Sequence, residues 1–372
     1  MQESKQIYAR FEGPEIFLEQ GRLLFSLLHV FAREGYGIAL HDWLGEAPLE
    51  KYGQMIHEIA SLRLTQAPPA DPSDWWYLYD RPQPDLNRLP WGKRVQVRFD
   101  LFAPFWRANP IIMPFPMHPM QSGLSPEALE RLRRSDRSMR VFFSGDTEHY
   151  RRVWIRYPRV KLPREPLVRA AVAGMGEDLV QVGSATDLAA LLAGGPVRKC
   201  VFTASSQVRI EFADWLPTLG RADFFLAPPG IVMPMCHNII EAMAVGTIPI
   251  TNYPEWLDPP LRHGRECLVF DDEASLVERL RQALAMDEAG IASMRAQVLD
   301  YYERYLRPDL FVRRLEESTE SVQPILMYTE RNVAKYARRL GRTSILMQGT
   351  ARPRPQGIVR RWLATFRPKT DE

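Results

Sequence analysis

Cysteine is scarce in this chain of 372 residues, and long apolar runs are missing. The three cysteines, Cys200, Cys236 and Cys267, are scattered without CxxC spacing. This argues against a disulfide framework and a zinc site, and it favours a reducing, cytoplasmic location. No apolar run approaches the roughly 20 residues of a membrane-spanning helix. The polar, charged residues 1–12 also predict that the chain starts without a signal peptide.

A large excess of charge of one sign is missing too. The 48 lysines and arginines nearly balance the 45 aspartates and glutamates, for a net charge of +3, so we expect no nucleic-acid partner. The G-x-G strings at 35–37 and 174–176 lack a third glycine and follow helix-like segments, and no G-x-x-x-x-G-K-[ST] phosphate loop occurs. These absences argue against a dinucleotide oxidoreductase and an NTPase.

Strand-like and helix-like segments alternate along the chain. With 45% hydrophobic residues, the length predicts two domains that each bury a core. In the first half, apolar residues recur at the helical period over 16–33, which predicts a helix there. Segments typical of strands lie at 6–11, 37–41, 75–79, 95–99 and 111–115. The pattern favours an α/β unit with a mostly parallel sheet.

A second α/β series follows a polar segment at 117–139, which we interpret as the linker between halves. Its predicted strands are 140–144, 179–182, 199–203, 224–228, 247–251 and 267–270, and the chain from 275 onward is largely helical in pattern. We therefore divide the chain into domains 1–137 and 138–322, followed by helices and a basic tail in 323–372. Two such halves predict a cleft in which ligands bind beyond the carboxyl ends of the strands.

Residues 223–251 carry the most informative pattern: a strand, a Pro-Gly turn, a helix and a second strand. Gly230 allows the backbone to come close to a ligand, and Gly246 is typical of a helix C-terminus. The helix N-terminus offers free N–H groups and a partial positive charge, which suit a diphosphate. His237 and Asn238 fall in its first turn, although a capping or packing role for the histidine stays open.

Glu241 follows four residues after His237, so both side chains project from one face of the predicted helix. A carboxylate inside an apolar helix needs a polar partner. At this position it could accept hydrogen bonds from the two vicinal hydroxyls of a ribose. We therefore predict a nucleotide-binding role for Glu241.

This pattern is similar to the donor-binding motif of the GT-B glycosyltransferases, and especially to that of the exostosin-like group. Phe142-Phe143-Ser144-Gly145 resembles the first strand and glycine turn of the family's C-terminal domain. Leu162-Pro163-Arg164 resembles the segment that follows, and Trp215-Leu216-Pro217 resembles the lead-in to the motif. The resemblance covers residues 140 to 310, approximately, and in the first half only the general layout agrees.

The resemblance implies two Rossmann-like domains facing a cleft, with C-terminal helices. It implies transfer of a sugar from a nucleotide sugar to a glycan or lipid-linked acceptor. The donor-binding residues that the pattern and the resemblance indicate are Ser144, Gly145, Arg164, Gly230, His237, Asn238 and Glu241. The Asp-x-Asp triplet of the other major glycosyltransferase fold is missing, so we expect no metal and no cofactor, with helix dipole and basic side chains neutralising the leaving diphosphate.

Two departures from the family bear on the reaction. Met233 stands eight positions before Glu241, where retaining members often carry a second glutamate, and the loop 231–235 lacks the basic residue common in exostosin-like members. Inversion is therefore favoured, and an inverting enzyme needs a general base at the cleft. The strand-end candidates are Glu12, His41, Asp42, Asp100 and His118, and the sequence leaves the choice open.

Two other functions fit the same fold. A nucleotide-sugar epimerase is the nearest enzymatic alternative, and product analysis would separate it from a transferase. A non-catalytic sugar- or nucleotide-binding protein is the alternative from another class.

The last residues form a basic, amphipathic pattern. Residues 352–369 contain six arginines and lysines, and Ile358, Val359, Trp362, Leu363 and Phe366 recur at helical spacing. Such a helix is typical of peripheral contact with a membrane surface, here its inner, cytoplasmic face. The alternative is that the apolar stripe packs against the N-terminal domain.

Overall fold

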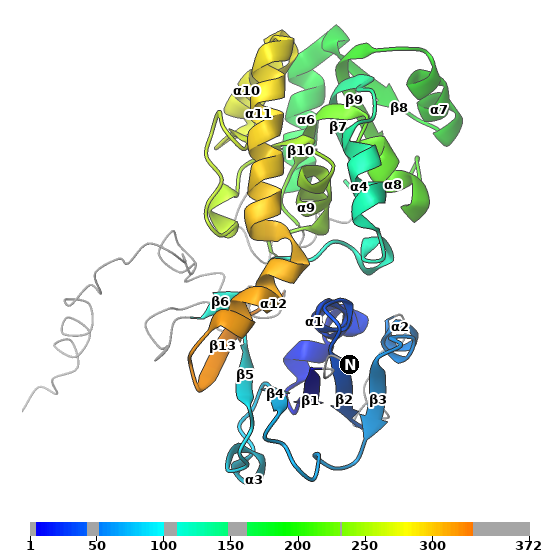
Figure 1. The fold of residues 1–372 in the computed structure, drawn as a ribbon. Helices are drawn as coiled ribbons and strands as arrows, with labels where there is room; N and C mark the ends of the chain where they lie inside the picture. Colours follow the sequence, from blue (N-terminus) through cyan, green and yellow to red (C-terminus); the bar gives the residue numbers. More distant parts are fainter. Residues whose placement is uncertain (1–4, 43–51, 100–109, 148–161, 231–232, 330–372) are drawn as a thin grey trace, which may run out of the picture.

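The computed structural model describes residues 5–42, 52–99, 110–147, 162–230 and 233–329. They form two sheets flanked by helices, which Figure 1 shows as two lobes one above the other. The seven-stranded sheet has the order β3-β2-β1-β4-β5-β13-β6, and the six-stranded sheet has the order β12-β11-β10-β7-β9-β8. All of these strand pairings are parallel. The predicted architecture of two Rossmann-like α/β units is confirmed.

The first sheet forms the lower lobe in Figure 1. Its strands are β1 (Gln6–Arg10), β2 (Gly37–His41), β3 (Leu62–Thr65), β4 (Trp75–Tyr79), β5 (Lys93–Arg98), β6 (Ile111–Ile112) and β13 (Val322–Leu326). Helix α1 (Arg22–Arg33) covers it with an apolar face whose Leu24, Leu27 and Phe31 are fully buried. The short helices of this lobe are α2 (Gly53–His57) and α3 (Pro84–Asn87).

The second sheet forms the upper lobe. Its strands are β7 (Met139–Gly145), β8 (Leu179–Val182), β9 (Val197–Ala204), β10 (Ala222–Ala227), β11 (Ile248–Thr251) and β12 (Leu268–Val269). Its helices are α4 (Pro126–Arg133), α6 (Arg164–Met175), α7 (Ala185–Ala193), α8 (Phe212–Leu219), α9 (His237–Ala244), α10 (Glu273–Ala285) and α11 (Glu288–Tyr301). Every residue of β10 is buried, as expected for a central parallel strand covered on both faces.

The chain crosses between the lobes twice. It leaves the first lobe at β6 and enters the second through α4, whose N-cap Ser125 accepts a hydrogen bond from the Ala128 amide. It returns through the π-helical turn η8 (Tyr302–Leu306) and α12 (Pro308–Glu317), and β13 then pairs with β5 and β6. Phe311 and Leu315 of α12 belong to the core of the first lobe. This packing differs from our predicted boundary at residue 322, because the first lobe also takes in α12 and β13.

One predicted helix is shorter than expected. Apolar residues continue the helical pattern back to Ile16, but α1 begins only at Arg22. Gln20 and Gly21 have left-handed backbones, with φ of 60° and 83°, and these interrupt the helix. Residues 14–17 and 19–21 form separate 3-10 turns instead. Arg22 consequently lies at a helix N-terminus and not in the middle of a longer helix.

The described part of the chain contains no helix that is both long enough and apolar enough to cross a membrane.

Candidate functional site

Helix α9 presents an open N-terminus beyond the carboxyl end of β10. Its N-cap, Cys236, is extended, with φ −140° and ψ 145°, and no side chain caps the helix. The first N–H groups therefore lack intrahelical partners, and the helix dipole adds partial positive charge. His237 and Asn238 occupy this first turn, as predicted, and both are half-buried.

The loop before α9 folds back tightly at Gly230. Its N–H donates a hydrogen bond of 3.1 Å to the carbonyl oxygen of Pro234. A Cβ at Gly230 would stand 2.5 Å from the carbonyl oxygen of Met233, so a larger residue would force the loop to move. Glycine is required here by close backbone approach within the loop itself.

Helix α6 begins beside this loop with Arg164, whose side chain is buried. Its Nη1 donates to the carbonyl oxygen of Asp146 at 3.3 Å, and its Nη2 lies 3.5 Å from the carbonyl oxygen of Pro229. A Cβ at Gly145 would stand 2.8 Å from Nη1, so this glycine makes room for the guanidinium. Arg164 thus connects the end of β7 to the loop after β10. No side chain caps α6, whose N-cap is Pro163.

Helix α1 of the first lobe begins with Arg22. Gly21, its N-cap, is left-handed, and neither a side-chain cap nor an acidic residue occurs in the first turn. The Arg22 guanidinium forms an ion pair with the carboxylate of Glu19. Its charge also lowers the pKa of His237 in α9, so Arg22 lies within electrostatic reach of the second lobe.

The N-termini of α1, α6 and α9 therefore meet at one locus between the lobes. Burial is the main cause that holds the pKa of His237 well below its usual value, and the charges of Arg22 and Arg164 act in the same direction. The imidazole is consequently neutral at physiological pH. Two cationic side chains and three uncapped helix N-termini attract a multiply charged anion. The described residues contain no cluster of three or more potential metal ligands.

Glu241, which we predicted to bind ribose, is fully buried. Its Oε1 accepts a hydrogen bond of 2.8 Å from the His118 amide, and its Oε2 accepts one of 2.6 Å from Nε1 of Trp215. Burial raises the pKa of Glu241 to about 7, against the opposing effect of these two bonds. Both oxygens are thus bonded within the protein, and ribose recognition by Glu241 stays a prediction.

His118 connects the linker to both lobes. Its Nε2 lies 3.1 Å from the hydroxyl of Tyr52, and its Nδ1 accepts a hydrogen bond of 3.2 Å from the Met120 amide. The ring stacks on Phe212 at 4.4 Å and meets the ring of His237 edge-on at 5.2 Å. Of the candidate bases, His118 therefore lies against the locus, but both of its ring nitrogens are engaged.

The other candidate bases lie at strand ends of the first lobe. Glu12 pairs with Arg10 at 2.7 Å, the Nδ1 of His41 lies 3.0 Å from the hydroxyl of Tyr8, and the exposed Asp42 accepts a hydrogen bond from Gln66. Burial and the charge of Arg10 lower the pKa of His41. Asp100 falls outside the described residues.

Ser144 is buried in β7, where it pairs with Thr203 of β9, and Gly145 follows it in the same strand. The position of Ser144 at the carboxyl end of a central strand agrees with the predicted layout. Contact of Ser144 with a donor stays a prediction.

Sequence reasoning missed Glu19, Arg22 and Tyr52. Gly21 immediately before Arg22 was the available signal, because a glycine can stop a helical pattern. The pairing of Arg22 with α9 depends on how the lobes sit against each other, which local patterns do not encode. The contact of Tyr52 with His118 joins residues 66 positions apart, so local patterns do not encode it either.

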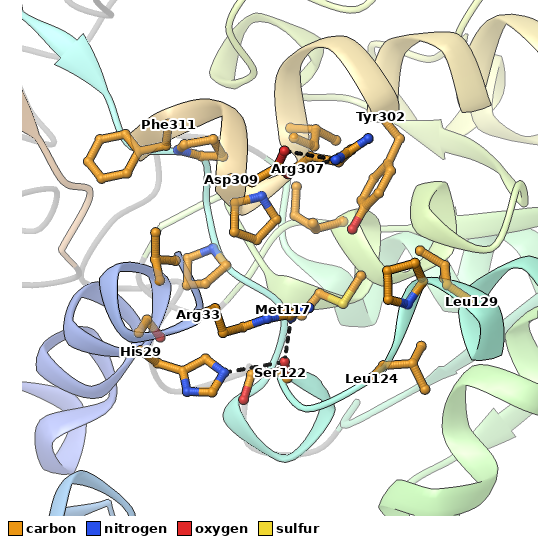
Figure 2. A pocket seen from close by; sticks show the side chains of 18 of the residues that line it. His29, Arg33, Met117, Ser122, Leu124, Leu129, Tyr302, Arg307, Asp309 and Phe311 are labelled. Carbon is orange, nitrogen blue, oxygen red and sulfur yellow. Dashed lines mark hydrogen bonds and ion pairs between the residues drawn. The ribbon is translucent and has the colours of Figure 1, made fainter. Parts of the chain in front are cut away.

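A separate cavity of about 640 Å³ is lined by residues of both lobes and of the linker. Figure 2 shows side chains from α1, the linker, α4, η8 and α12 around it. His29 Nε2 and Arg33 Nη1 both contact the carbonyl oxygen of Ser122, at 3.3 Å and 2.8 Å. Its lining includes Ile240 of α9 but none of Arg22, Arg164 and His237. The cavity is therefore distinct from the anion-attracting locus.

Comparison with known proteins gives structural likeness only. No protein-family model and no curated protein matches the chain. Among solved structures, the Anabaena protein Alr3699/HepE in complex with UDP is 10% identical, with a TM-score of 0.45 over 84% of this chain and 98% of that chain. A glycosyltransferase from Rickettsia africae is 8% identical, with a TM-score of 0.45 over 85% and 98%. WaaG, a glycosyltransferase involved in lipopolysaccharide biosynthesis, is 15% identical, with a TM-score of 0.37 over 84% and 99%.

Proposed function

We propose that the protein is a glycosyltransferase that takes a sugar from a nucleoside-diphosphate donor. The observation that supports it is the meeting of three uncapped helix N-termini with Arg22 and Arg164 between two parallel α/β units. Such a site is suited to a diphosphate, and it lies beyond the carboxyl end of β10, where ligands bind in open α/β sheets.

The same residues supply what the leaving group needs. As the bond between the anomeric carbon and the phosphate oxygen breaks, negative charge grows on the diphosphate. Fixed N–H dipoles and the two guanidinium groups stabilise that charge without a metal ion. The neutral His237 adds a hydrogen-bond donor in the same turn of α9.

The acceptor side follows from the resemblance described above. We propose a glycan or lipid-linked acceptor, inversion at the anomeric carbon, and membership of the exostosin-like group. Inversion requires a base to remove the acceptor proton, and His41 is our choice, because its lowered pKa keeps the imidazole neutral. The alternatives are an epimerase or a binding protein, which would yield a changed donor sugar or no product.

Titration calorimetry with UDP, GDP, ADP and CDP tests the donor site. We expect one of these to bind, and Arg164→Gln to weaken binding about tenfold to a hundredfold, because a charged hydrogen bond contributes about 1.5–3 kcal/mol. Arg169→Gln is the matched control, since Arg169 lies on the same helix, is exposed, and pairs with Glu165 at 3.1 Å. The nucleotide affinity of Arg169→Gln should equal that of the wild type.

Two results would oppose the proposal. Lack of binding by all four nucleotides would remove the donor site, and equal affinity of the folded Arg164→Gln variant would remove Arg164 from it. Transfer from the matching nucleotide sugar, followed by mass spectrometry, should continue in excess EDTA. Activity that vanished in EDTA and returned with manganese would contradict the metal-independent site.

A further inference from the structure

The turn before α1 has an unusual backbone. Glu19 and Gln20 have φ of 57° and 60°, and within the described residues they are the only non-glycine residues with positive φ. Such a conformation is costly for residues with a Cβ and persists only where the surroundings impose it. The turn therefore sets the position of Glu19 and of the helix start that follows it.

Only one of the two carboxylate oxygens of Glu19 has a partner among the described residues. Its Oε2 takes part in the ion pair with Arg22, while its Oε1 is buried and has no hydrogen-bond partner among the described residues. Leaving a buried acceptor oxygen without a partner is unfavourable. The ion pair with Arg22 thus holds the carboxylate in a position where its Oε1 accepts no hydrogen bond from the described residues.

Arg22 interacts both with Glu19 and, through its charge, with the second lobe. Its charge acts on Cys236, His237 and Glu241, the residues at the start of α9 and one turn beyond. A guanidinium offers five N–H donors, and it binds phosphate as readily as carboxylate. The cation that faces the proposed diphosphate site is thus the one that Glu19 neutralises.

We propose that Glu19 is an internal counter-ion, which occupies Arg22 in the donor-free protein and gives it up to the donor's diphosphate. This proposal rests on the proposed function. Glu19 is a positioning residue that acts through Arg22 and does not touch the sugar. A diphosphate carries more negative charge than one carboxylate, so it displaces Glu19 from the ion pair with Arg22. Repulsion between the two anions then favours movement of the turn away from the donor.

The proposal predicts that loss of the Glu19 charge tightens nucleotide binding. With the nucleotide that binds best among UDP, GDP, ADP and CDP, Glu19→Gln should raise the affinity about threefold to tenfold, as expected for loss of one competing ion pair. The same change in an Arg22→Ala background should have no effect, because the cation for which the anions compete is gone. The matching nucleoside, which lacks the diphosphate, should bind the wild type and Glu19→Gln with equal affinity.

Glu15→Gln is the matched control. Glu15 lies in the same turn region and contacts Arg81 at 3.8 Å, so the substitution removes the same charge without freeing Arg22. Its nucleotide affinity should equal that of the wild type. Thermal unfolding of each variant verifies folding, and Glu19→Ala repeats the test if Glu19→Gln is unstable.

The outcomes separate the two proposals. If the wild type binds none of the four nucleotides, both the donor site and the counter-ion are overturned. If the wild type binds one of them but folded Glu19→Gln binds it equally or more weakly, only the counter-ion is overturned. A gain in affinity that persists in the Arg22→Ala background would also overturn it, because the effect would then not pass through Arg22.

Discussion

Nε1 of Trp215 donates a hydrogen bond of 2.6 Å to Oε2 of Glu241, which joins α8 to α9 through a fully buried carboxylate. The other oxygen receives the His118 amide, so the same side chain also fixes the linker. A buried acid is costly unless its oxygens are bonded, and here the protein supplies both bonds. Glu241 is therefore positioned to hold the linker against the second lobe.

This arrangement predicts an unusual dependence of stability on pH. Burial raises the pKa of Glu241 to about 7 from its usual 4.5. Between these values the folded protein binds more protons than the unfolded chain. The free energy of unfolding should therefore fall as pH rises through this window, by up to about 3 kcal/mol.

Urea unfolding at several pH values across this window measures the slope of the free energy of unfolding against pH. Glu241→Gln cannot titrate, so its slope should be flatter than that of the wild type. Glu266→Gln, at a buried glutamate that pairs with Arg262 and Arg265, should keep the wild-type slope. Identical slopes for wild type and Glu241→Gln would contradict the raised pKa.

A second prediction concerns the space that Gly145 leaves for Arg164. In Gly145→Ala the new Cβ would stand 2.8 Å from Nη1, so the guanidinium must shift from its place in the proposed donor site. We expect nucleotide affinity to fall about tenfold, which corresponds to about 1.4 kcal/mol. Gly183→Ala is the control, since a Cβ there meets no atom within 4 Å. Wild-type affinity in a folded Gly145→Ala protein would contradict the role of this contact.

A third prediction concerns the base. The pKa of His41 is lowered, so the imidazole accepts a proton only below the usual range. If His41 is the base, kcat/KM should be lost as pH falls through this lowered pKa, while nucleotide affinity stays constant. His41→Gln should remove that limb and most of kcat, and His57→Gln, at an exposed histidine of the same lobe, should change neither. An unchanged pH profile in His41→Gln would exclude it and return the choice to Glu12 and Asp42.

The sequence predicted most strands because apolar runs bounded by turn residues are local signals. Residues 37–41 and 179–182 agree with the structure residue for residue. The strand β3, Leu62–Thr65, was missed because it is short and alternates with polar residues. The place of α12 and β13 in the first lobe also escaped prediction, because it depends on pairing over more than two hundred residues of chain.

The donor-binding residues were predicted on one lobe only, and the first lobe supplied only candidate bases. Gly230, His237 and Asn238 could be predicted as donor-binding residues because a loop and a helix start leave a pattern in neighbouring residues. The facing Arg22 could not, since the apolar period continues through the 3-10 turns before it and hides the true helix start. The partners of Glu241 were equally hidden, because His118 and Trp215 are distant in sequence.

The last prediction concerns residues 352–369, which fall outside the described residues. Their six basic residues contribute roughly 1 kcal/mol each near an anionic membrane surface, and the apolar stripe adds burial. We expect the full chain to co-sediment with vesicles containing anionic lipid, and a chain ending at Gly349 to stay in solution. Neutral vesicles should bind neither protein. Equal binding of both chains would exclude the tail as an anchor, and unfolding on truncation would show instead that its stripe packs against the first lobe.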